Sequence, residues 1–140
     1  MRLLLAIDDS KFSEAATQAV MTQFQTQGTQ VSILNVVDLD IPIPTSYAAG
    51  FREESLQQGL EIVRRAEHQL KKAGYAVQSA VEEGDPKSTI LDYAARWNAD
   101  LVVVGSHGRK GAERFLMGSV SEAVSRHATC SVEIVRMAKS

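Results

Sequence analysis

Short apolar runs along the chain are separated by longer stretches in which apolar residues recur every three or four positions. The apolar runs lie at 3–7, 31–37 and 101–104, and each is too short to be a typical helix. Such runs are typical of strands that are buried on both faces of a parallel sheet. The segments 76–82 and 131–136 instead alternate apolar with polar residues, which predicts edge strands.

Helical spacing predicts four helices between these strands. They cover 11–27, 52–73, 86–97 and 119–127. Gly28 and Gly74 are expected to end the first two helices. Asp85, as N-cap, and Pro86 are expected to begin the third. The stretch 38–51 contains prolines and has no clear period, so it is predicted to be one long loop.

Strands that alternate with helices indicate an α/β fold, here a three-layer α/β/α sandwich with a five-stranded parallel sheet. Placing the most apolar strands at the centre gives the order 3-2-1-4-5, with right-handed crossovers. With 140 residues, of which 44% are hydrophobic, the chain fits a single domain over 1–140. Ligands bind such sheets beyond the carboxyl ends of the strands where the strand order reverses, here between the first and fourth strands. These strands lead into Asp8-Asp9-Ser10 and Gly105.

The composition gives no sign of a nucleic-acid or membrane partner. The formal net charge is −2, and the basic residues are scattered rather than gathered in a stripe. The apolar run at the start is shorter than the core of a signal peptide, and no other segment approaches the length of a membrane span. Cys130 is the only cysteine, so it forms no internal disulfide, which fits a reducing cytoplasm. We expect it to be a packed thiol rather than a nucleophile. The histidines lack the spacing of a zinc site.

The strand at 101–104 leads into a loop that is rich in glycine. Its glycines are Gly105, Gly108, Gly111 and Gly118. Ser119, with Glu122 three residues later, is predicted to begin the last helix as a capping box. Exposed N–H groups and the positive end of a helix dipole form an anion site, and Arg109 and Lys110 add positive charge beside it. The loop is therefore interpreted as a phosphate cradle.

Three well-known glycine motifs do not fit this loop. A P-loop needs Lys followed by Ser or Thr after its last glycine, and Ala112 follows Gly111 instead. The dinucleotide fingerprint fails because both Ser106 and His107 stand between the first two glycines. A nucleophile elbow would need a glycine two positions before Ser106, where Val104 stands.

The remaining pattern, G-x2-G-x9-G-S, resembles the signature of the ATP-binding subgroup of the universal stress protein family. It is filled by Gly105, Gly108, Gly118 and Ser119. The resemblance covers nearly the whole chain, from A-I-D-D-S near the start, through G-D-P at 84–86, to the strand before Arg136. It implies a Rossmann-like fold of the adenine nucleotide alpha-hydrolase-like kind and a cytoplasmic protein of the stress response. The implied cofactors are ATP or another adenine nucleotide, with Mg²⁺ held through its phosphates rather than by protein ligands.

The candidate site residues follow from the motif, the strand ends and the resemblance. Asp8 could accept hydrogen bonds from an adenine amino group or a ribose, as the resemblance implies, or Asp8 or Asp9 could cap the first helix in competition with Ser10. The resemblance places the backbone near Val36 at the adenine edge. His107 is predicted either to contact the ligand or to be solvated. The complete predicted binding set is Ala6, Ile7, Asp8, Ser10, Val36, Gly105, Ser106, His107, Gly108, Arg109, Lys110, Gly118, Ser119, Val120 and Ser121.

Gly118 is expected to lack a side chain because a phosphate approaches its backbone closely. The stretch 38–51 is expected to cover the site or a partner surface, because Ile41, Ile43, Tyr47 and Phe51 are more apolar than a solvated loop requires.

The sequence favours a binding protein over an enzyme. It shows no in-line arrangement for hydrolysis and no Lys-Ser/Thr pair that would grip a metal and the β/γ-phosphates. We therefore expect a regulatory protein with slow or no turnover and no catalytic residue. A module of the same family that dimerises without binding ATP is an alternative, although this chain keeps the glycine signature.

Two alternatives come from other classes of protein. A phosphoacceptor receiver domain shares the five-stranded fold and begins with paired acids such as Asp8-Asp9. It also needs an aspartate after the third strand and a lysine after the last, whereas Glu-Glu-Gly at 82–84 and Ile-Val-Arg at 134–136 stand there. A flavin-binding electron carrier is disfavoured because few aromatic residues are available to stack on the flavin ring.

The last strand, 131–136, is expected to lie at an edge of the sheet and to pair with a second copy of the chain. The resemblance implies this homodimer. Ser131 stands where the family usually has proline, and Glu133 where it has an apolar residue. Two copies of Glu133 that face each other would repel. Val132 and Ile134 share one face of the strand and favour the dimer.

Overall fold

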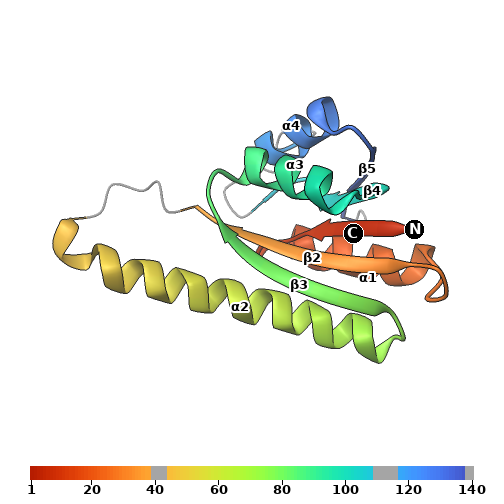
Figure 1. Ribbon diagram of the computed structural model, residues 1–140, viewed down its shortest axis with the longest axis horizontal. Helices are drawn as coiled ribbons and strands as arrows, with labels where there is room; N and C mark the ends of the chain where they lie inside the picture. The colour runs from red at the N-terminus through yellow and green to blue at the C-terminus, as the bar shows by residue number, and fades with distance from the viewer. Residues whose placement is uncertain (39–43, 109–116, 138–140) are drawn as a thin grey trace.

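The computed structural model describes residues 1–38, 44–108 and 117–137 (Figure 1). The sheet has five strands in the order β3-β2-β1-β4-β5, and all neighbouring strands are parallel. The strands are β1 Arg2–Ala6, β2 Gln30–Val37, β3 Ala76–Glu83, β4 Leu101–Gly105 and β5 Ser131–Val135. The helices are α1 Lys11–Gln23, η1 Thr45–Tyr47, α2 Ala48–Lys72, α3 Pro86–Trp97 and α4 Ser119–His127. The predicted α/β class and strand order are confirmed.

Helices cover both faces of the sheet and form two separate cores. Leu3 and Leu5 of β1 pack in the core that includes residues of α1 and α2, whereas Leu4 packs in the core beneath α3 and α4. All three leucines are fully buried. Because successive side chains of a strand point to opposite faces, a continuous apolar run is what a central strand between two helical layers requires.

The first strand is joined to the last third of the chain at the amino ends of β1 and β4. The N–H of Arg2 donates to Asp100 Oδ2 at 2.7 Å, and the N–H of Asp100 donates to the Arg2 carbonyl at 2.8 Å. The Arg2 guanidinium lies 4.3 Å from the centre of the Trp97 ring, so this tryptophan packs against both the core and a cation.

The first helix is shorter than its apolar pattern predicts. It ends at Gln23, not at 27, and the Tyr75 hydroxyl donates hydrogen bonds to the carbonyls of Val20 and Phe24. Burial raises the pKa of Tyr75, which keeps the hydroxyl protonated as a donor. A side chain that is distant in sequence therefore satisfies carbonyls at the end of α1, and Gly28 provides a later turn with φ 85°.

The second helix begins earlier than predicted. It starts at Ala48, directly after η1, so the loop expected over 38–51 is wrong for its second part. Most residues in the first turn of α2 are exposed, because the amino end of this helix extends beyond the sheet (Figure 1). Their sequence therefore shows no apolar period. Ile41 and Ile43 lie outside the described residues, so the predicted cover over the site stays a prediction. No helix within the described ranges is long and apolar enough to cross a membrane.

Helix α2 packs closely on the sheet at Gly59. A Cβ atom at this position would lie 2.7 Å from Asn35 Oδ1 and 3.0 Å from Val81 Cγ1. Both atoms belong to β2 and β3 near their carboxyl ends, where neither strand can move without disturbing its neighbours. The lack of a side chain therefore sets how close α2 lies to these strand ends.

Gly59→Ala should destabilise the protein by about 1–3 kcal/mol, because the added methyl group overlaps Asn35 and Val81. Gly50→Ala, in the same helix with no atom within 4 Å of its Cβ position, should stabilise it by about 0.5–1 kcal/mol. Urea unfolding of the two variants measures both changes. A Gly59→Ala protein as stable as Gly50→Ala would contradict the close packing.

Candidate functional site

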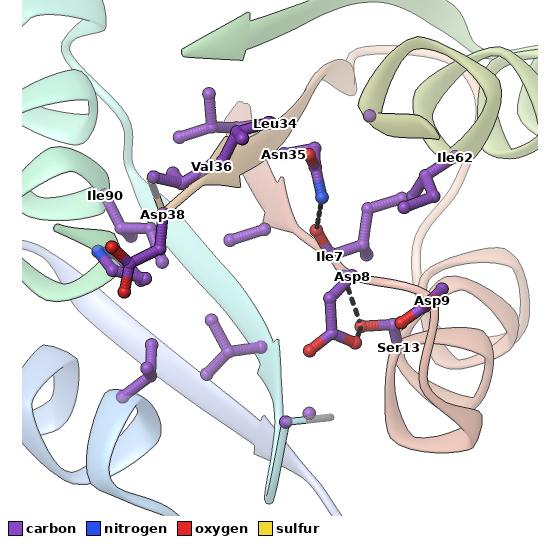
Figure 2. A pocket seen from close by; sticks show the side chains of 18 of the residues that line it. Ile7, Asp8, Asp9, Ser13, Leu34, Asn35, Val36, Asp38, Ile62 and Ile90 are labelled. Atoms are coloured by element: carbon purple, nitrogen blue, oxygen red, sulfur yellow. Dashed lines mark hydrogen bonds between the residues drawn. The ribbon is translucent and has the colours of Figure 1, made fainter. Parts of the chain in front are cut away.

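A cavity of about 420 Å³ opens at the carboxyl ends of β1 and β4 (Figure 2). These strands are neighbours, with Ala6 paired to Val104, yet their chains continue to helices on opposite faces. The backbone groups beyond the two strands therefore cannot pair with each other, which leaves space at the point where the strand order reverses.

Most of the predicted site residues line this cavity. From β1 and the residues after it come Ala6, Ile7 and Asp8, and from β2 comes Val36. From the glycine loop and the start of α4 come Gly105, His107, Gly108, Gly118, Ser119, Val120 and Ser121. Ser10 and Ser106 are not among the lining residues, and Arg109 and Lys110 lie outside the described residues.

The backbone that enters the cavity after β1 is held by β2. The Ile7 N–H donates to the Leu34 carbonyl at 2.9 Å, and the Asn35 side-chain amide donates to the Ile7 carbonyl at 2.9 Å. Figure 2 shows this amide pointing from β2 to Ile7. Asn35 is 5% exposed, so the hydrogen bond satisfies a buried donor and a strand-end carbonyl together. The only sequence signal was a polar residue within an apolar strand.

Asp8 contributes to the start of α1 and also lines the cavity. Ser10 is the N-cap of α1, because its side chain accepts a hydrogen bond from the Ser13 N–H. Asp8 Oδ1 accepts from the Ser10 N–H and from the Ser13 hydroxyl, both at 2.9 Å. The alternative in which Asp8 or Asp9 caps the first helix is thus wrong, although Asp8 supports the turn before the helix.

The wall of the cavity formed by the glycine loop and the start of α4 is held in place by the carbonyl of Ser106. It accepts hydrogen bonds from the Gly118 N–H at 2.7 Å and from the Ser121 hydroxyl at 2.8 Å. The Ser106 N–H donates to the Val135 carbonyl at 2.8 Å, which continues the pairing of β4 with β5. Ser106 therefore holds both ends of the glycine loop against the sheet.

His107 is buried beside the cavity. It is 8% exposed, and its ring centre lies 5.1 Å from that of Phe12. Its Nδ1 is 3.2 Å from the Ser106 hydroxyl. The alternative of a solvated loop histidine is therefore wrong, and His107 presents part of its surface to the cavity.

The glycines of the motif that the structure describes provide space rather than unusual backbone angles. Gly105, Gly108 and Gly118 all lie outside the left-handed region of φ. A Cβ on Gly105 would lie 2.8 Å from the Phe12 carbonyl oxygen, and a Cβ on Gly118 would lie 3.2 Å from the His107 Cα. The backbone of Ser106 and His107 thus lies close to Gly118, and the close approach of a phosphate stays a prediction.

The last helix does not begin with the predicted capping box. Gly118 is the N-cap and Ser119 is the first helical residue, so the interpretation of Ser119 as N-cap is wrong. The Gly118 carbonyl accepts from the Glu122 N–H at 3.0 Å and from the Ser121 hydroxyl at 3.0 Å. Because Gly118 fits against Ser106, the N-cap lies one residue before Ser119, and α4 covers the predicted residues 119–127. Its first-turn N–H groups lie along the cavity, where a helix amino end favours an anion.

Helices α2 and α3 contribute walls that the motif does not mark. The residues from α2 are Phe51, Ser55, Gln58, Gly59 and Ile62, and those from the start of α3 are Asp85, Pro86, Lys87 and Ile90. The sequence reasoning also missed Asp9, Ser13, Leu34, Asn35, Val37 and Val104, whereas Asp38 and Phe51 belong to the stretch 38–51 that was predicted to cover the site or a partner surface. Figure 2 shows Asp38 on the side of Ile90, across the cavity from Asp8.

The described residues indicate neither a nucleophilic thiol nor a metal site. Within 1–38, 44–108 and 117–137 no group of three or more His, Cys, Asp and Glu side chains could hold a metal ion. Cys130 is half-buried against the core beneath α3 and α4, and burial raises the pKa of its thiol. A raised pKa lowers the thiolate fraction, which agrees with a packed thiol rather than a nucleophile.

Comparison with known sequences gives one family. Residues 1–136 match the universal stress protein family. The chain is 31% identical over 145 residues to universal stress protein YxiE of Bacillus subtilis (strain 168), and this alignment covers 96% of the chain and 98% of that protein.

Solved structures share the fold at lower identity. Hypothetical protein MJ0577 superimposes with a TM-score of 0.89 at 23% identity, covering 99% of this chain and 97% of that one. A universal stress protein family protein of Arabidopsis thaliana with AMP bound gives 0.77 at 19% identity, covering 99% and 92%. A universal stress protein in complex with cAMP gives 0.66 at 23% identity, covering 97% and 96%.

Gly105→Ala should destabilise the ligand-free protein by about 1–3 kcal/mol, because its methyl group would overlap the backbone of α1 at Phe12. Gly108→Ala is the matched control, because its Cβ meets only the end of the Asp8 side chain, at 3.0 Å. Its methyl group meets no backbone atom, so its loss of unfolding free energy should be smaller, about 0.5–1 kcal/mol. Urea unfolding without nucleotide compares the two, and equal losses of stability would show that Gly105 is not a packing glycine.

Proposed function

Because the chain belongs to the universal stress protein family, we propose that it binds an adenine nucleotide, ATP in particular, in the cavity between β1 and β4. One observation carries this proposal: a wall with exposed N–H groups and an apolar wall meet in one cavity, where the strand order reverses. The first turn of α4, Ser119 to Ser121, supplies N–H groups suited to phosphates. Val36, Ile90 and Val104 supply an apolar surface suited to a flat base.

Two structural relatives support adenine as the base. One was solved with AMP bound and the other in complex with cAMP, and both share this fold. In the present chain Asp8 lines the same cavity as the apolar wall, where a carboxylate can accept hydrogen bonds from an exocyclic amino group. We propose that Asp8 reads the base and that the start of α4 holds the phosphates.

Mg²⁺ belongs to the proposal through the nucleotide. The described residues offer no cluster of metal ligands, so the ion would be held mainly by phosphate oxygens, as Mg²⁺ commonly is. The ion would neutralise phosphate charge there, while the backbone N–H groups of Ser119 and Val120 would orient the phosphates, because the Gly118 N–H already donates to the Ser106 carbonyl.

We propose a regulatory role in the stress response, with slow or no hydrolysis. Asp8 Oδ1 is already engaged by two donors, the Ser10 N–H and the Ser13 hydroxyl. This arrangement suits a fixed acceptor more than a general base that must take a proton from water. Occupancy of the site by nucleotide, rather than its turnover, would then be the signal.

The receiver-domain alternative has no acceptor where it needs one. Glu82 and Glu83 end β3 in place of an acceptor aspartate. Glu82 is paired with Arg96 of α3 at 3.1 Å, and Glu83 is paired with Arg52 of α2 at 2.6 Å. Both carboxylates therefore join the edge strand to the neighbouring helices, which favours a structural role.

The proposal includes a homodimer that pairs β5 with its two-fold copy. Val132 and Ile134 pack into the core beneath α3 and α4, so the pairing would use the backbone edge of β5 rather than these side chains. Glu133 is the middle residue of β5, and its Oε2 is buried without a hydrogen-bond partner among the described residues. Two copies of Glu133 would face each other across a two-fold axis at this position, so their charges would weaken the pair.

Calorimetric titration with ATP, AMP and GTP tests the nucleotide proposal. We expect binding heat with the adenine nucleotides and weaker binding of GTP. Asp8→Asn should weaken ATP binding by about 0.5–1.5 kcal/mol, because the hydrogen bond from the base would lose its charged acceptor. Asp92→Asn, on an exposed position of α3 outside the cavity, should leave it unchanged. No heat with any adenine nucleotide at millimolar concentration would refute the proposal.

Light scattering over micromolar concentrations tests the dimer. Glu133→Gln removes the facing charges and should shift the monomer–dimer equilibrium toward dimer by about threefold to tenfold. Glu61→Gln removes the same charge from an exposed position of α2 and should leave the equilibrium unchanged. A monomeric mass for the wild type and both variants would reject the pairing of β5.

A further inference from the structure

Ser13 contacts Asp8 twice from the first turn of α1. Its Oγ accepts a hydrogen bond from the Asp8 backbone N–H at 2.8 Å and donates one to Asp8 Oδ1 at 2.9 Å (Figure 2). Ser13 is 6% exposed, so water competes little for either bond. One hydroxyl group therefore fixes the main chain and the side chain of Asp8 together.

The carboxylate of Asp8 has a defined orientation as a result. Oδ1 also accepts from the Ser10 N–H at 2.9 Å, so the Ser10 and Ser13 donors to this oxygen approach it from the start of α1. The other oxygen, Oδ2, is turned toward the glycine loop, where a Cβ on Gly108 would lie 3.0 Å away. A rotation of the carboxylate out of this plane would break both hydrogen bonds to Oδ1.

We propose that Ser13 is a positioning residue that sets the orientation of Asp8 and thereby the preference of the site for a 6-amino purine. This inference rests on the proposed nucleotide site and goes beyond it, because it assigns base selectivity to a residue that need not touch the base.

The chemistry of the purine edge explains why orientation matters. Adenine carries an amino group at C6, which donates to a carboxylate oxygen, whereas hypoxanthine carries a carbonyl oxygen there, which a carboxylate repels. ATP and ITP share the ribose and the phosphates, but they also differ at N1, which is an acceptor in adenine and an N–H donor in hypoxanthine. A carboxylate that is held in one orientation therefore discriminates between adenine and hypoxanthine, whereas a carboxylate that can turn away tolerates both bases.

A double-mutant cycle with Ser13→Ala and Asp8→Asn tests the inference. Calorimetry gives the affinities of ATP and ITP for the wild type, both single variants and the double variant. Ser13→Ala should lower the ATP-to-ITP affinity ratio about fivefold to tenfold, mainly through weaker ATP binding. In the Asp8→Asn background Ser13→Ala should leave the ratio unchanged, because Ser13 acts through Asp8. Ser13→Thr, which keeps the hydroxyl, should restore most of the preference.

Thr17→Ala is the matched control. Thr17 lies one turn further along α1, is 3% exposed, and donates its hydroxyl hydrogen bond to the Ser13 carbonyl at 3.0 Å instead of to Asp8. Its loss should leave the ATP-to-ITP ratio unchanged. Amide hydrogen exchange without ligand gives a second measurement, in which the Asp8 amide should lose protection in Ser13→Ala and keep it in Thr17→Ala.

Four outcomes would overturn the inference. An unchanged ratio in a folded Ser13→Ala protein would remove Ser13 from base selection, as would equal effects of Ser13→Ala in the wild-type and Asp8→Asn backgrounds. A wild type that binds ATP and ITP equally would overturn this inference and leave the nucleotide proposal intact. A wild type that binds no adenine nucleotide would overturn both.

Discussion

The contact between α1 and β4 at Gly105 is the constraint on which the rest of the site depends. The backbone of Phe12 lies where the side chain of any other residue at position 105 would be, so α1 rests directly on the end of the strand. This places the first turn of α1 beside Gly105, and Ser10 and Ser13 hold Asp8 next to Gly108. The same contact brings the Phe12 ring against His107, and so connects the two walls of the cavity.

The sequence was sufficient to predict the architecture, because the burial of a strand determines its pattern of apolar and polar residues. Leu3 to Leu5 must be apolar on both faces when helices cover both, and the alternation in β3 and β5 follows from their places at the edges. The ends of α1 and α2 could not be predicted in the same way. The end of α1 is accompanied by a hydroxyl from Tyr75, far along the chain, and α2 begins where the sheet no longer imposes a period.

The candidate site was predictable where a motif encodes it and not where contacts between distant elements make it. The glycine spacing and the acids after β1 indicated both walls of the cavity. Asn35, Ser13 and Gly59 carry no motif, because each matters only through the atom that the fold brings to it. The capping box at Ser119 failed for a related reason, since the fit of Gly118 against Ser106 decides where α4 begins.

The pairing of β1 with β4 has a consequence for the biosynthesis of the protein. Arg2 and Asp100 exchange hydrogen bonds across 98 positions of sequence, so β1 leaves the ribosome long before its second neighbour is made. Until then the run from Leu3 to Leu5 has an open edge whose side chains are entirely apolar, the kind of edge to which other unfinished chains adhere. The start of α4 is translated last among the walls of the cavity, so the cavity is complete only after β4 has covered this edge.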